Sequence, residues 1–272
     1  MIDDRDFPGK WQGFGVPHTA RGIAAAYGPP PWRMSGRAMS VWYRLAEPEE
    51  VLRQVPANME MDSDPVLRAT FWDLQHDAGL PDLVDEVGHS FSFQEASLAF
   101  PVRAYGRTGD NTVYMYANDA RYIAFGREVM GWPVQGGDVR LEPQGMNPRD
   151  AAPGDRRSGS LWAFGRCVMR MNIELRSRVV QSDAESPPPQ WITQKVVPSV
   201  EDRPASLNEV VLTAPSKAEM TDAWDCSATL EMHEAPGHEL QYLQPREILS
   251  ARYWEDVQLT LGFGKVLRSF LA

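Results

Sequence analysis

One short segment combines a cation, an anion, a large aromatic side chain and a proline. It spans residues 126–133 and reads GREVMGWP. Arg127 and Glu128 are candidates for an ion pair, and Trp132 could form one wall of a binding cavity. Because proline fixes its own φ, Pro133 could direct the side chains that follow it into that cavity. The segment therefore indicates a small-molecule site, with a plain strand-to-turn junction as the alternative.

Other catalytic and cofactor-binding patterns in the chain are incomplete. His233 and His238 are five positions apart with Pro236-Gly237 between them, so they cannot form the histidine pair on one helix face that a zinc-protease site needs. The chain has no GxSxG pentapeptide for a serine nucleophile. The glycine turns at 106–109 and 262–265 lack the spacing that cradles a phosphate. We expect no metal and no cofactor.

Amine and thiol nucleophiles are few. Only four of the 27 basic residues are lysines. They are Lys10, Lys195, Lys217 and Lys265. The two cysteines, Cys167 and Cys226, form no CxxC pair, which is typical of small buried side chains in a reducing compartment. A cytoplasmic location is therefore expected.

Composition and charge exclude several classes of protein. Of the 272 residues, 43% are hydrophobic and 24% are charged, which is near the average for folded chains. The net charge of −10, without a run of basic residues, repels phosphate backbones, so we expect no nucleic-acid partner. No window reaches 18 uninterrupted apolar residues, and the first residues lack the pattern of a signal peptide. We expect neither a membrane partner nor secretion.

The elements that must position any site are mostly strands. An extended arm over residues 1–31 is expected to end in a polyproline segment, and a short helix is expected over 47–55. A pair of strands around a turn at Asn118-Asp119 is expected within 112–125, followed by one helical turn at 127–130. Further strands are expected over 38–44, 65–74, 90–105, 161–180, 191–197, 209–212 and 228–232, and a mixture of strand and terminal helix over 245–271.

These closely spaced strands indicate one domain over residues 1–272. The predicted fold class is α+β, mainly antiparallel β, and the 21 glycines and 22 prolines favour many turns. An antiparallel barrel and a strongly curved sheet both fit the pattern, and a cavity is among the alternatives.

The chain resembles the acetoacetate decarboxylase superfamily over roughly residues 28–271. Besides GREVMGWP, the resemblance rests on ordered segments along the chain. They are VWYR at 41–44, VLRQVP at 51–56, SFQEASLAFPV at 92–102, KVVP at 195–198 and AWDCSATLEM at 223–232. The resemblance implies a cone-shaped antiparallel β barrel with flanking strands and a few helices, a mostly apolar pocket and a homo-oligomer. It also implies chemistry in which a desolvated lysine forms an imine with a keto acid, for which acetoacetate decarboxylase is the known example.

The sequence departs from the family pattern at the reacting group. Val134 and Gln135 stand where the decarboxylases have two successive lysines, and an isopropyl group cannot attack a carbonyl. Thr70 stands where the family has one acidic pocket residue, whereas Glu95 retains the other. Arg37 lies one position from the arginine that binds the substrate carboxylate in the family. The resemblance thus implies a retained pocket without the Schiff-base lysine.

Acid–base chemistry remains available to such a pocket. Glu95 is predicted to act as a general acid or base if apolar neighbours disfavour its charge, and Arg37 to hold a carboxylate or enolate. The expected substrate-binding residues are Thr70, Trp72, Phe93, Tyr116, Trp132, Val134 and Gln135. Lys195 matches a second lysine of the decarboxylases and is interpreted as a structural contact.

Three functional hypotheses follow. The first is a cofactor-independent lyase, dehydratase or cyclase acting on an enolisable keto acid or polyketide-like small molecule in secondary or catabolic metabolism. The second is a non-catalytic protein that binds a small molecule in the decarboxylase-like pocket. The third is a decarboxylase that uses a relocated lysine.

Overall fold

A computed structural model describes residues 27–28, 30–77, 90–142, 151–179 and 190–270. Most of the expected arm over residues 1–31 lies outside these residues. The strands are β1 (Trp32–Leu45), β2 (Val66–Asp77), β3 (Phe91–Ala104), β4 (Arg107–Ala117), β5 (Val134–Gly136), β6 (Asp138–Glu142), β7 (Arg156–Ala163), β8 (Arg166–Arg178), β9 (Trp191–Val197), β10 (Leu207–Thr213), β11 (Pro215–Met232), β12 (Pro245–Leu261) and β13 (Lys265–Ser269). The helices are α1 (Pro48–Leu52), α3 (Ala120–Phe125), the π-helix η1 (Gly126–Met130) and the 3₁₀ helix η4 (Leu240–Tyr242).

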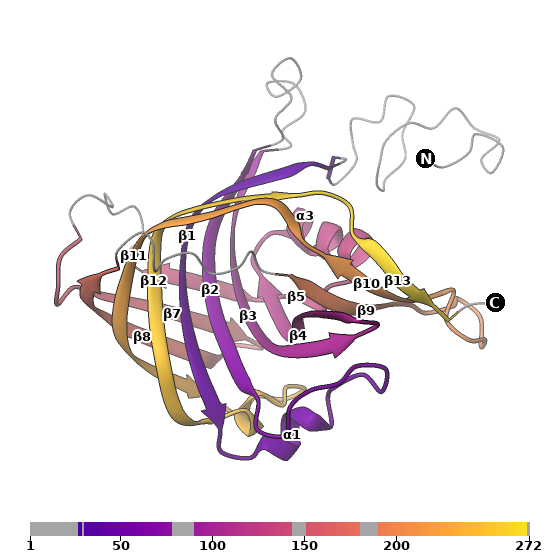
Figure 1. Ribbon diagram of the computed structural model, residues 1–272, viewed down its shortest axis with the longest axis horizontal. Coiled ribbons are helices and arrows are strands. Elements are labelled where there is room, and N and C mark those ends of the chain that lie inside the picture. The colour runs from indigo at the N-terminus through magenta and orange to yellow at the C-terminus, as the bar shows by residue number, and fades with distance from the viewer. Residues whose placement is uncertain (1–26, 29, 78–89, 143–150, 180–189, 271–272) are drawn as a thin grey trace.

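All of the strands belong to one curled sheet. Its order is β13-β10-β9-β4-β3-β2-β1-β12-β11-β8-β7-β6, and β5 pairs with β4. Neighbouring strands are antiparallel except for β4–β5 and β4–β9. The sheet curls into the expected cone (Figure 1), but within the described residues its edge strands β13 and β6 do not pair with each other. The mainly antiparallel fold class is therefore confirmed, with a curled open sheet in place of a closed barrel.

Both faces of the central strands β1, β2 and β3 are buried. Because side chains alternate along a strand, Met39 and Phe71 point to one face whereas Ala38 and Trp72 point to the other. The first face is covered by β6, β7 and β8, and a Cβ on Gly159 of β7 would lie 2.3 Å from the Met39 Cε atom. We call this the strand face. The other, which we call the helix face, is covered by α3, η1 and β5.

Two local expectations were wrong. The second strand expected within 112–125 is instead helix α3, because the Asp119 side chain accepts hydrogen bonds from the backbone N–H groups of Arg121 (2.8 Å) and Tyr122 (3.2 Å). Such a side-chain cap satisfies N–H groups that a helix start leaves free, and so favours helix over strand. The expected terminal helix is replaced by the strands β12 and β13.

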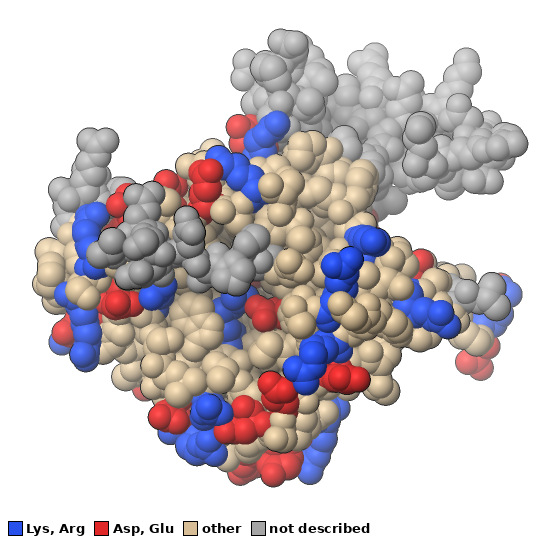
Figure 2. Space-filling view, in the orientation of Figure 1, with Lys and Arg blue, Asp and Glu red and all other residues tan. Residues whose placement is uncertain are grey.

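The charge distribution on the surface and the character of the helices complete the description of the fold. On the face shown in Figure 2, basic and acidic side chains of the described residues are interspersed. None of the helices in the described part of the chain has the length and apolar character needed to cross a membrane.

Candidate acid–base site around Glu95

Glu95 lies in the middle of β3 and points to the helix face. Only 3% of its surface is exposed. The Tyr122 hydroxyl donates a hydrogen bond of 2.5 Å to the Glu95 Oε2 atom. Tyr122 is held at this position because α3 begins at the Asp119 cap and turns over the sheet. The carboxyl group therefore sits between a strand and a helix, with one fixed donor.

Aromatic side chains surround this pair. The Phe93 and Tyr122 rings are stacked, with centroids 3.9 Å apart and an interplanar angle of 17°. Trp132 lies 6.3 Å from the Tyr122 ring, measured between centroids. Trp72 is directly opposite Glu95 in the β2–β3 ladder. Trp72 and Phe93 thus lie on the same face of the sheet as Glu95, and Trp132 lies beside Tyr122, the hydrogen-bond partner of Glu95.

Burial controls the titration of Glu95. Desolvation raises its pKa to about 7, although hydrogen bonds from Tyr122 and Ser97 and the charge of Arg68 act in the opposite direction. Burial, together with the nearby Glu95 charge, also raises the Tyr122 pKa well above 10, so this hydroxyl stays a neutral donor. A carboxyl group with these properties can take up and release a proton near neutral pH.

A row of side chains runs across the helix face beside Glu95. Each of its members is the ladder partner of the next, and the row crosses the strands β5, β4, β3, β2 and β1. In that order the members are Val134, Met115, Ser97, Thr70 and Ser40. Residues that are opposite each other in a sheet share a face. Thr70 and Ser40 are hydrogen-bonded through their hydroxyl oxygens at 2.9 Å. Thr70 and Val134 therefore lie on the face of the sheet that carries Glu95, and the hydroxyls of Ser40 and Ser97 lie on the same face.

A small cavity lies beside the aromatic neighbours of Glu95. A cavity of about 10 Å³ lies against Phe93 and Tyr122, which is room for about one water molecule. Its other lining residues are Tyr27, Trp32, Met34, His76, Phe91 and Phe125. Aromatic side chains make up most of this lining, and Glu95 is not part of it.

The Arg37 side chain points to the opposite face of the sheet from Glu95. Its guanidinium donates to the Asp73 carboxylate at 2.8 and 2.9 Å and to the Leu141 carbonyl oxygen at 3.5 Å, on the strand face. The physical reason is the period of two along a strand, by which a shift of one residue reverses the direction of a side chain. Gly36 instead occupies the position on the helix face, where a Cβ would lie 2.0 Å from the Asp73 carbonyl oxygen. The expected carboxylate-binding arginine is thus turned away from the site.

Tyr116 and Gln135 are also turned away from Glu95. Tyr116 is opposite Ala96 in the ladder, belongs to the core of the strand face and shares a hydrogen bond with His238. Gln135 is exposed on the far side of β5 from Val134. The direction of strand alternation places both residues outside the candidate site.

The GREVMGWP segment folds as the π-helix η1 and the turn after it. Arg127 donates to the Val134 carbonyl oxygen at 3.2 Å, whereas Glu128 accepts from the Tyr27 hydroxyl, so the two side chains are directed to different partners. The Lys195 ammonium donates to the Glu128 and Val129 carbonyl oxygens at 2.5 and 3.2 Å. This cation near the end of η1 agrees with a structural role for Lys195.

Besides Ser40, three residues that act on Glu95 were missed from the sequence. Tyr122, Ser97 and Arg68 all act on the Glu95 carboxyl group. The signal for Tyr122 is the Asp119 cap, which would have predicted a helix with Tyr122 in its first turn. Ser97 was visible as the residue two positions after Glu95, on the same face of the strand.

The raised pKa of Glu95 predicts a pH-dependent stability. Between its ordinary pKa of 4.5 and its folded value of about 7, the folded protein binds more protons than the unfolded chain, so stability falls as pH rises. Replacement by glutamine mimics the protonated form. The free energy of unfolding of this variant does not respond to the titration of Glu95. Between pH 4.5 and 8, the wild type should therefore lose about 3 kcal/mol of stability compared with Glu95→Gln.

Urea unfolding at a series of pH values measures this difference. Glu234→Gln, at an exposed position, is the matched control and should differ from the wild type by no more than about 0.5 kcal/mol at each pH. A difference between wild type and Glu95→Gln that stays constant with pH would show that Glu95 titrates like an ordinary surface carboxylate.

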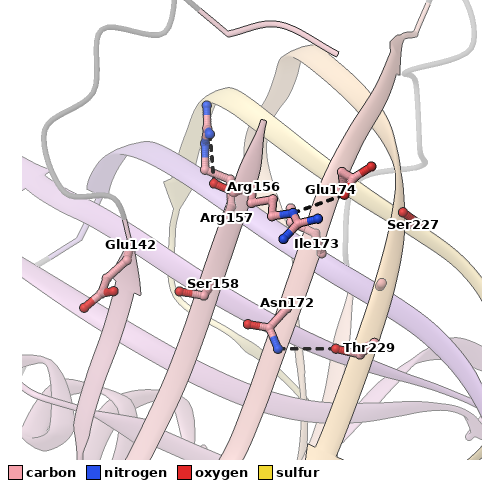
Figure 3. Close-up of a pocket in the computed structure, with 10 residues that line it drawn as sticks. Glu142, Arg156, Arg157, Ser158, Asn172, Ile173, Glu174, Ser227 and Thr229 are labelled. Carbon is pink, nitrogen blue, oxygen red and sulfur yellow. Dashed lines mark hydrogen bonds and ion pairs between the residues drawn. The ribbon is translucent and has the colours of Figure 1, made fainter. Parts of the chain in front are cut away.

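A larger pocket lies elsewhere, over β6, β7, β8 and β11 (Figure 3). It has a volume of about 1010 Å³, and polar side chains line it, including an Arg156–Glu174 ion pair of 3.2 Å and a hydrogen bond of 3.3 Å from Asn172 to Thr229. Its lining includes none of the predicted site residues. We therefore assign the candidate chemistry to the smaller site around Glu95.

Comparisons with known proteins agree with this fold. The chain is 28% identical over 263 residues to an acetoacetate decarboxylase of Chromobacterium violaceum, covering 96% of this chain and 97% of the relative. It is 26% identical over 262 residues to an acetoacetate decarboxylase of Ralstonia nicotianae, covering 95% and 96%.

Solved structures share the architecture. The enduracididine biosynthesis enzyme MppR, in complex with the condensation product of pyruvate and imidazole 4-carboxaldehyde, superposes with a TM-score of 0.80 at 22% identity, covering 96% of this chain and 98% of that one. An acetoacetate decarboxylase-like enzyme from Sphingomonas wittichii RW1 gives a TM-score of 0.82 at 17% identity, covering 95% and 100%. The family model for acetoacetate decarboxylase (ADC) matches residues 16–271. This chain belongs to the acetoacetate decarboxylase family.

Proposed function

We propose that the protein is a cofactor-independent lyase, dehydratase or cyclase that acts on an enolisable keto acid through acid–base catalysis at Glu95, without a Schiff base. The observation that carries the proposal is the buried Glu95 carboxyl group, hydrogen-bonded to Tyr122 among aromatic rings. Its pKa of about 7 suits a group that both removes and returns a proton. Membership of a family whose relatives include decarboxylases supports chemistry on keto acids.

The reaction can be written as two proton transfers. The Glu95 carboxylate removes a proton from the carbon next to the substrate carbonyl, and the electron pair of that C–H bond forms the C=C bond of an enolate. The neutral Glu95 carboxyl then gives the proton either to a departing hydroxyl group, which leaves as water, or back to carbon. The nearby hydroxyls of Thr70 and Ser97 are neutral donors for the enolate oxygen.

The lysines support a mechanism without an imine. Val134 stands where the family resemblance implies the reacting lysine, and its side chain is fully buried on the helix face. Lys195 is engaged by two carbonyl oxygens of η1, Lys217 pairs with Glu219 at 3.0 Å, and Lys265 is exposed in β13. Lys10 lies outside the described residues.

Two alternatives remain from the sequence. A non-catalytic binding protein would use the buried aromatic side chains around Glu95 to hold a ligand without proton transfer. A decarboxylase with a relocated lysine would use Lys195, whose pKa burial lowers.

A related structure suggests the first substrates to test. MppR was crystallised with pyruvate and with a condensation product of pyruvate, and it is an enzyme of a biosynthetic pathway. We therefore propose 2-oxo acids as the first substrate class and secondary metabolism as the setting. We also propose a homo-oligomer in the cytoplasm, which the exposed apolar side chains of Phe164 and Val200 and the free thiols of Cys167 and Cys226 support.

The test is solvent deuterium exchange, because it detects enolisation before the final product is known. A panel of 2-oxo and 3-oxo acids is incubated with the protein in D₂O, and NMR follows the C–H signal next to the carbonyl. We expect at least one acid to lose this signal faster than it does without protein. If acids bind, as a titration would show, but none exchanges, the binding protein replaces the enzyme as the best function.

A further inference from the structure

The hydrogen bond between Glu95 and Tyr122 joins two different elements of the fold. Glu95 is in β3, whereas Tyr122 is in α3, which begins three residues after β4 ends at Ala117, the ladder partner of Glu95. A hydrogen bond weakens steeply when its distance or angle changes, so the hydroxyl reaches the carboxyl group only if α3 leaves β4 in one direction. The connection Asn118-Asp119 must therefore fix that direction.

Asn118 ties this connection to the residue next to Glu95. Its Oδ1 atom accepts from the Gln94 backbone N–H at 2.8 Å, and its Nδ2 atom donates to the Gln94 Oε1 atom at 3.1 Å. The Asn118 backbone N–H donates to the Gln94 carbonyl oxygen at 3.3 Å. Nδ2 also donates, at 3.5 Å, to the Val139 carbonyl oxygen of β6. One asparagine thus holds the backbone and the side chain of Gln94.

Asp119 ties the same connection to the helix that carries Tyr122. Its Oδ1 atom accepts from the backbone N–H groups of Arg121 and Tyr122. The Arg121 guanidinium donates to the Oδ2 atom of the same carboxylate at 2.8 Å, which fixes the capping side chain.

Together these contacts close a ring. Its members, in order, are Glu95, Gln94, Asn118, Asp119 and Tyr122. Each is joined to the next by a peptide bond or by hydrogen bonds, and the Tyr122 hydroxyl closes the ring on the Glu95 carboxyl group at 2.5 Å. A closed ring of this kind leaves α3 little freedom to turn away from β3.

We propose that Asn118 is a positioning residue that holds the Tyr122 hydroxyl on the Glu95 carboxyl group. Asn118 is exposed, so it acts on the carboxyl group through Gln94 and Asp119. General acid–base catalysis depends on a reacting group that is held in one orientation, so the value of this positioning for turnover rests on the proposed function.

The experiment titrates Glu95 by NMR of its side-chain carboxyl carbon, in protein labelled with ¹³C at glutamate. Loss of one signal in Glu95→Gln assigns it. Tyr122→Phe removes a hydrogen bond to the charged carboxylate and should raise the Glu95 pKa by about one unit. Asn118→Ala should raise it by at least about half as much, because the hydroxyl is no longer held in place. Asn172→Ala is the matched control, since it removes an exposed asparagine with a side-chain hydrogen bond in β8, and it should leave this pKa unchanged.

A double-mutant cycle separates positioning from a general structural effect. If Asn118 acts through Tyr122, Asn118→Ala should add little to the shift that Tyr122→Phe already causes. Arg68, whose charge also acts on Glu95, is unchanged in every variant.

Asp119 provides a second pair of variants at the other joint of the ring. Asp119→Ala removes the cap and should raise the Glu95 pKa, although loss of a negative charge alone would lower it. Asp119→Asn also loses the charge but keeps a capping oxygen, so it should not raise the pKa. This pair decides the proposal if Asn118→Ala does not fold, because an equal pKa in both variants would contradict it.

Two results of the cycle would overturn the proposal. One is a Glu95 pKa in Asn118→Ala that equals the wild-type value. The other is an equal shift from Asn118→Ala with and without the Tyr122 hydroxyl, because Asn118 would then act on Glu95 by another route. Since the titration uses no substrate, the proposal can fail while deuterium exchange of keto acids succeeds, and it can hold while that exchange fails.

Discussion

Glu95→Gln should lose enolisation of any keto acid that the wild type turns over, by about 10²–10⁴-fold, the range that general acid–base catalysis contributes. Its affinity for the same acid should stay within about tenfold, or roughly 1.4 kcal/mol. Glutamine keeps the shape of the buried side chain and can still accept from the Tyr122 hydroxyl. It cannot take up a proton, so chemistry is lost while binding is kept.

The measurement pairs deuterium exchange with calorimetric titration of the same acid. Glu234→Gln is the control for removal of one carboxylate, and it should retain the wild-type exchange rate. Tyr122→Phe gives a second check, because loss of its hydrogen bond raises the Glu95 pKa further and should move the pH profile of exchange upwards.

The opposite outcomes are informative about function. Exchange that survives in Glu95→Gln would place the base elsewhere. If the wild type shows no exchange and Glu95→Gln loses binding, the protein is a binding protein in which Glu95 recognises the ligand.

Val134→Lys should convert the protein from one that borohydride does not trap into one that carries a reduced keto-acid adduct. Val134 is fully buried and lies two strands from Ser97 on the helix face, so the new amine would enter the region of Glu95. Burial lowers the pKa of an amine and makes it nucleophilic near neutral pH. The expected result is an adduct on nearly every variant molecule and none on the wild type.

Intact-mass spectrometry after borohydride treatment with the keto-acid panel gives this result directly. Val196→Lys places an amine at an exposed position of β9 and is the control for non-specific reduction. Circular dichroism of Val134→Lys beforehand checks that the variant folds, since a buried amine is costly.

Each adduct pattern has a distinct meaning. An adduct on the wild type that maps to Lys195 would mean that imine chemistry has moved, and the noncovalent mechanism would be wrong. Trapping only in Val134→Lys would show that the pocket admits keto acids while the native side chains work without an imine. A folded Val134→Lys protein that is never trapped would argue against keto acids as ligands of this site.

Local patterns were sufficient for much of the fold. The strands expected over 90–105 and 191–197 are β3 and β9, and the helix expected over 47–55 contains α1. Motif order along the chain was sufficient for the family, which the match over residues 16–271 confirms. The exception, α3, shows that one capping side chain at Asp119 outweighs the strand preference of the residues that follow.

The sequence by itself determined the family and identified Glu95 as a candidate carboxyl group for acid–base chemistry. Only the tertiary structure decided that Arg37 points to the opposite face of the sheet from Glu95. It also decided that Ser40, Thr70 and Ser97 are ladder partners on the Glu95 face. The physical reason is that the face and the neighbours of a strand residue depend on its register with other strands, and a shift of one position reverses the face. Register is set by packing between segments far apart in the chain, which no local pattern contains.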